Sequence, residues 1–147
     1  MTEGLVIVGL WTFTALRPVQ ALPADEIRYH LKAPTATEKM IFEFREDGTD
    51  RLRWELLDEG KFCERTGQYT WVNNELVSKV TALHEGNDQS CGSDPDMVVG
   101  ETTTTSARIE NNQLILTLAV ATDKAELIFD RSPEWCPKEL AGSEACP

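Results

Sequence analysis

Apolar and polar residues alternate with a period of two along much of this chain. In the segment 40–45, Met40, Phe42 and Phe44 share one phase, while Glu43 and Arg45 share the other. Residues two apart lie on the same face of a β-strand, so this pattern predicts a strand with one buried face. Similar segments follow one another, and we expect eight strands, at residues 5–15, 40–45, 51–57, 62–72, 75–84, 97–110, 114–121 and 125–130.

The connections between these strands differ in length. Those at 46–50, 73–74 and 111–112 are short, and the last two are Asn-Asn pairs, which tolerate the left-handed conformation of tight turns. Those at 17–39 and 85–96 are long and rich in Pro, Gly and polar residues. If successive strands alternate in direction, the short connections lie at one end and the long ones at the other. This favours an up-and-down barrel, with one closed and one open end, over a sandwich.

We therefore predict an all-β chain with an eight-stranded antiparallel up-and-down β-barrel. A length of 147 residues suits one domain, 1–147, with its strands within about 5–131 and a short irregular tail at 132–147. The formal net charge of −11 would repel a phosphate backbone, so nucleic acid is not an expected partner. No apolar run approaches the thickness of a bilayer, so we expect no integral membrane segment.

The chain has four cysteines and no Cys-x-x-Cys pair. An even number of separated cysteines favours two disulfides in an oxidising compartment, whereas a zinc site usually begins from a close pair. We therefore expect a secreted or periplasmic protein. The segment 5–16 lacks the preceding positive charge of a secretory signal, so we interpret it as a strand and expect any signal or lipid anchor upstream of Met1.

The first strand carries Gly9-Leu10-Trp11, and Arg131 follows the last strand. With the eight-strand pattern, these residues resemble the lipocalin and calycin superfamily, in which a Gly-x-Trp motif lies on the first strand. The resemblance implies that Trp11 fills the closed end of the barrel and that Arg131 packs over it. The turn at 111–112 lacks the Thr-Asp-Tyr signature of kernel lipocalins, so the chain looks like a divergent, bacterial-type lipocalin-like domain.

The barrel topology suggests how the cysteines pair. Cys63 begins the fourth strand and Cys91 follows the fifth, so both belong to the open end; Cys136 and Cys146 both lie in the tail. We expect the pairs Cys63–Cys91 and Cys136–Cys146. Many lipocalins instead join the fourth-strand region to the tail, and the resemblance therefore leaves Cys63 with Cys136 or Cys146 as the alternative.

Large apolar residues share the phase expected to face the barrel interior. An eight-stranded barrel either is filled by its own side chains or holds one small ligand. If a cavity remains, this set would line a site for an apolar molecule. The candidate lining residues are Phe42, Phe44, Trp54, Leu56, Tyr69, Trp71, Leu118, Leu127 and Phe129.

No pattern in the chain predicts catalysis, a cofactor or a metal. Two histidines, His30 and His84, lack a metal-binding spacing, and Asp88, Asp94 and Asp96 lack the ligand order of an EF-hand. We predict a non-enzymatic protein that carries or senses a small hydrophobic ligand in the barrel. The alternative is a filled barrel whose open-end loops bind a protein partner, for example as a protease inhibitor or an envelope structural protein.

Overall fold

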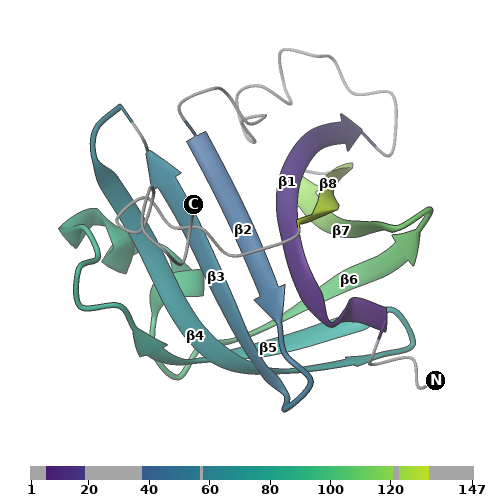
Figure 1. Cartoon of the computed structure of the whole chain (residues 1–147), viewed down its shortest axis with the longest axis horizontal. Helices are drawn as coiled ribbons and strands as arrows, with labels where there is room; N and C mark the ends of the chain where they lie inside the picture. The colour runs from purple at the N-terminus through teal and green to yellow at the C-terminus, as the bar shows by residue number, and fades with distance from the viewer. Residues whose placement is uncertain (1–5, 19–37, 57, 121–122, 133–147) are drawn as a thin grey trace.

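Eight antiparallel strands close into a barrel in the computed structural model, which describes residues 6–18, 38–56, 58–120 and 123–132 (Figure 1). Each strand pairs with the next, and the last pairs with the first, so the predicted eight-stranded antiparallel up-and-down barrel is confirmed. The strands are β1 (Gly9–Pro18), β2 (Glu38–Phe44), β3 (Thr49–Leu56), β4 (Lys61–Val72), β5 (Glu75–Leu83), β6 (Thr102–Glu110), β7 (Gln113–Val120) and β8 (Asp123–Ser132).

The first strand begins later than predicted. Residues 6 and 7 are helical, and β1 starts at Gly9, whose φ of +139° suits glycine at the change of direction. The indole N–H of Trp11 donates to the carbonyl of Ile7, four residues earlier, which fixes this helical turn beneath the strand. A continuous apolar run does not separate a buried helical turn from a strand, and the start at residue 5 was therefore wrong.

The sixth strand also begins later than predicted, at Thr102 and not at residue 97. The segment expected as a loop contains two short 3₁₀-helices, η1 (Gln89–Ser93) and η2 (Pro95–Met97). Asp94 caps η2 with its side chain, and Pro95 occupies its first position, where a missing N–H costs nothing. Met97 belongs to this helix and is buried, so its apolar character reflects a helix contact and not a strand.

The closed end of the barrel lies at the turns that join β4 to β5 and β6 to β7. Tight turns there use Asn at positive φ: Asn73 at 53°, Asn74 at 59°, Asn111 at 52° and Asn112 at 62°. Such φ values at both central residues are those of a type I′ hairpin turn, whose twist matches the flanking strands. The predicted role of the Asn-Asn pairs as hairpin turns is thus confirmed, and the short turns bring the strand ends together over the core.

Candidate ligand cavity

A cavity of about 130 Å³ lies inside the barrel. Strands β2 to β8 and the helix η2 all contribute to its wall. The apolar part of the wall consists of Met40, Phe42, Leu52, Trp54, Leu76, Leu116, Leu118, Leu127 and Phe129. The polar part consists of Arg65, Ser78, Asp96, Thr103 and Thr105. A mostly apolar cavity with a few convergent polar groups is the usual form of a small-molecule site.

The structure separates the predicted lining residues into two groups. The cavity is lined by Phe42, Trp54, Leu118, Leu127 and Phe129. The rest lie elsewhere: Phe44, Tyr69 and Trp71 pack in the core near the closed end, and Leu56 is partly exposed at the end of β3.

Position along the strand decides which of the in-phase residues reach the cavity. Phe44 lies beside the closing turn and stacks on Phe42 with ring centroids 4.4 Å apart. Its ring also meets Tyr69 edge to face at 5.0 Å, and the Tyr69 hydroxyl donates to the Arg45 carbonyl. These rings fill the interior at the closed end of the barrel. The cavity therefore lies between these rings and the open end.

A buried ionic cluster forms one side of the cavity wall. Arg65 on β4 pairs through Nη1 with the carboxylate of Asp50 on β3, and through Nη2 it donates to Ser78 Oγ on β5 at 3.1 Å. Ser78 in turn donates to Asp50 Oδ2 at 2.6 Å. All three residues are at least 95% buried, and burial of two charges is tolerated when they are paired and hydrogen-bonded in this way. This cluster was not predicted.

Two further polar features accompany the cluster. Within the described part of the chain, Nε of Arg65 is buried and has no hydrogen-bond acceptor. Asp96 on η2 completes the wall, and burial, together with the neighbouring carboxylate of Asp94, raises the pKa of Asp96 above its usual value, with Arg65 opposing the shift. The side chains that line the cavity thus include a guanidinium with one N–H that lacks an acceptor among the described residues and the carboxylate of Asp96.

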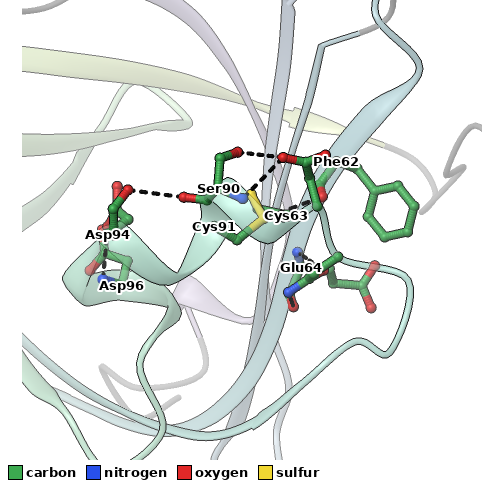
Figure 2. The surroundings of a disulfide bond; sticks show 10 residues. Phe62, Cys63, Glu64, Ser90, Cys91, Asp94 and Asp96 are labelled. Carbon is green, nitrogen blue, oxygen red and sulfur yellow. Dashed lines mark hydrogen bonds between the residues drawn. A yellow bond between two sulfur atoms is a disulfide. The ribbon is translucent and has the colours of Figure 1, made fainter.

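A disulfide attaches the helices η1 and η2 to the barrel wall (Figure 2). We call residues 88–97 the cap. Cys91 on η1 is joined to Cys63 on β4, as predicted, so the alternative pairing of Cys63 with the tail is wrong. Met97 forms a small buried cluster with both cysteines, against which Trp54 packs, and Asp96 on the same helix lines the cavity. The other two cysteines, Cys136 and Cys146, lie outside the described residues.

Comparison with solved structures identifies the fold. A lipocalin-like protein from Bacteroides uniformis matches 86% of this chain and 99% of its own, with a TM-score of 0.56 and 14% identity. A protein from Bacteroides eggerthii described as uncharacterized matches 86% and 99%, with a TM-score of 0.51 and 11% identity. The chain has the lipocalin-like barrel fold. No protein-family model matches the sequence, and the comparison with curated proteins finds no significant match.

The closed end of this lipocalin-like barrel has the Trp–Arg contact that the resemblance implied. Trp11 is fully buried, and the guanidinium carbon of Arg131 lies 4.2 Å from the centroid of its ring. Arg131 also donates to the carbonyls of Val6 and Val8 and to Asn112 Oδ1. Gly9 leaves room for this side chain, because a Cβ there would lie 2.8 Å from Arg131 Nη1. Arg131 thus connects the segment before β1 with the turn between β6 and β7.

The histidine that the structure describes stabilises a turn of the lipocalin-like barrel. Nδ1 of His84 accepts a hydrogen bond from the Gly86 N–H, and its ring packs edge to face on Phe62 at 5.0 Å. His30 lies outside the described residues. Among the residues that are described, no group of three or more His, Cys, Asp or Glu side chains is placed to hold a metal ion. No helix in the same residues is long and apolar enough to cross a bilayer.

A second, larger hollow lies on the outside of the lipocalin-like barrel and is distinct from the cavity. It measures about 340 Å³ and is bordered by the β2–β3 turn and by the outer faces of β4 and β5. Gln68, Thr70 and Lys79 on its border are exposed. This hollow lacks the enclosing apolar wall of a small-molecule site, so the interior cavity is the better candidate.

Proposed function

We propose that this lipocalin-like barrel is a non-enzymatic carrier or sensor that binds one small hydrophobic molecule in its interior cavity. The observation that carries the proposal is the composition of the wall, in which nine apolar side chains surround about 130 Å³. An engineered apolar cavity of about 150 Å³ binds benzene or xenon, so this volume suffices for a molecule of that size. Burial of its apolar surface supplies the free energy of binding.

A secreted or periplasmic location is part of this proposal. It is supported by the Cys63–Cys91 disulfide, because disulfides persist in oxidising compartments and are rare in the reducing cytosol. Outside the cell, a small hydrophobic molecule needs a protein to keep it in solution, which fits a carrier or sensor.

Toluene tests the proposal, because it is apolar and close to benzene in size. We expect titration to shift the methyl NMR signals of Leu118, Leu127 and Leu116, which line the cavity, with saturation at one molecule per chain. Chemical shifts confined to surface residues, or no saturable shifts, would show that the interior is filled in solution and would favour the loop-binding alternative.

A pair of leucine substitutions supplies the matched control. Leu118→Trp fills the cavity and should weaken toluene binding by at least about tenfold, the equivalent of about 1.4 kcal/mol. Leu83→Trp makes the same chemical change at a residue that is 43% exposed outside the cavity, and it should leave binding unchanged. Equal affinities in the two variants would place toluene somewhere other than the cavity.

A further inference from the structure

The charges around the cavity bear on which ligands it accepts, given the proposed binding function. The charge of Arg65 is neutralised by its ion pair with Asp50, so the pair contributes no net charge to the wall. Asp96 then adds a carboxylate of its own, and Asp94 caps the same helix through its side chain. The polar end of the cavity is therefore net negative whenever Asp96 is ionised.

A ligand carboxylate in this cavity would meet unfavourable conditions. It would bring a second negative charge next to Asp96 inside the barrel, where the effective dielectric constant is lower than in bulk water and charge repulsion is therefore stronger. Because Arg65 is already paired with Asp50, its positive charge is not available to offset that of a ligand carboxylate. Its desolvation would thus be poorly compensated.

A neutral oxygen atom fits the same surroundings. The buried Nε of Arg65 lacks an acceptor among the described residues, and it belongs to a side chain that lines the cavity. An alcohol or carbonyl oxygen accepts a hydrogen bond without adding charge. A hydroxyl proton can in addition be donated to Asp96, which is acceptor-only when ionised. One polar atom on the ligand would then satisfy groups on both sides.

We infer that the cavity selects small neutral ligands that carry an oxygen, alcohols above all, and rejects carboxylates of the same size. The selectivity is set by Asp96 through its charge and by Arg65 through its Nε. A cavity of about 130 Å³ limits these ligands to roughly the size of a substituted benzene ring.

Three matched probes, toluene, benzyl alcohol and benzoate, test this inference at pH 7.5. They share a ring and differ in the substituent. In the wild-type chain we expect benzyl alcohol to bind at least about tenfold more tightly than benzoate, because one charge repulsion at an effective dielectric near 20 exceeds that ratio. Toluene reports on the cavity itself. Saturable toluene binding with equal affinities for the other two would overturn the inference and leave the proposed function standing, whereas failure of all three would overturn both.

Asp96→Asn isolates the carboxylate, since it removes the charge and keeps the shape. We expect benzoate affinity to rise at least about tenfold, while toluene affinity stays within about twofold. Asp58→Asn makes the same charge change at an exposed residue of the β3–β4 turn and should alter none of the three affinities. An unchanged benzoate affinity in Asp96→Asn, or an equal rise in both variants, would refute the role of Asp96.

Arg65→Lys tests the donor. Lysine keeps a cation for Asp50 but has no N–H at the position of Nε. Benzyl alcohol affinity should fall about tenfold relative to toluene, as expected for the loss of one hydrogen bond from a charged donor. An unchanged ratio of these two affinities would show that Nε does not contact the ligand.

Discussion

Gly67 is the residue whose replacement by alanine tests the buried ionic cluster most directly. It lies on β4 at an irregularity in the pairing with β5, between the residues that form the cluster. A Cβ at this position would lie 2.3 Å from the Lys79 carbonyl oxygen, 2.8 Å from Asp50 Oδ1 and 3.0 Å from Arg65 Nη1. The carbonyl is backbone and cannot rotate away, so the strands themselves must shift.

Two costs add up in the Gly67→Ala variant. Overpacking a well-packed interior costs about 1 to 3 kcal/mol. Displacement of Asp50 or Arg65 weakens a buried ion pair whose complete disruption would cost about 3 to 5 kcal/mol. Partial loss of the pair together with the backbone shift leads us to expect a decrease of about 2 to 4 kcal/mol in the free energy of unfolding. That is a large share of the stability of an ordinary domain.

Urea unfolding followed by tryptophan fluorescence measures this decrease. Gly92→Ala is the control, because a Cβ there meets nothing within 4 Å. We expect the control to lie within about 0.5 kcal/mol of the wild type, as for most surface substitutions. A Gly67→Ala variant as stable as Gly92→Ala would refute the steric argument and the tight cluster geometry derived from it.

Two other predictions concern stability. Replacing both cysteines of the Cys63–Cys91 disulfide, which are 28 residues apart, by serine should lower the free energy of unfolding by about 3 to 4 kcal/mol in urea, and a loss below about 1 kcal/mol would contradict a constraining role. For Glu126, burial raises the pKa, but hydrogen bonds from Arg108 and Arg17 outweigh it and lower the pKa below 4.5. Since the folded pKa lies below the unfolded one, its stabilisation is present at neutral pH and is lost as the pH falls through the folded value. Glu126→Gln should therefore be less stable than the wild type by up to about 1 kcal/mol per ion pair at pH 7, and the difference should shrink as acid protonates Glu126 in the folded protein; a gap independent of pH would contradict this.

The barrel was predictable because its signals are local. The alternation at 40–45 and the Asn-Asn turns each depend on neighbouring residues in the sequence. The loop lengths then favour a barrel over a sandwich. The errors arose where one local pattern fits two structures. Met97 and the apolar residues after it fit the start of a strand, whereas a capping aspartate and a proline begin a short helix there that includes Met97. The predicted start of β1 was wrong for a similar reason, because an apolar run fits both a buried helical turn and a strand.

The polar wall of the cavity could not be predicted with the same reasoning, although a signal for it existed. Asp50 shares its phase with Leu52 and Trp54, and Arg65 shares its phase with Tyr69. Charged residues in an apolar phase are usually strand ends or outward positions, because an unpaired buried charge is costly. Here each charge has its partner on an adjacent strand. This pairing depends on residues that are far apart in the sequence. The volume of the cavity that remains after the side chains have packed depends on such residues as well.

The backbone pairing between neighbouring strands is not equally extensive around the barrel. Among the described strands, β1 pairs with β2 only at Gly9–Thr12, yet it pairs with β8 as far as Pro18, and in Figure 1 its upper part curves away from β2. Separating β1 from β2 toward the open end therefore breaks the fewest backbone hydrogen bonds, whereas the cap is tethered to β4 by the Cys63–Cys91 disulfide. The lifetime of a bound molecule would then depend on how often these two strands part, and a cross-link between them would slow uptake and release equally without changing the affinity.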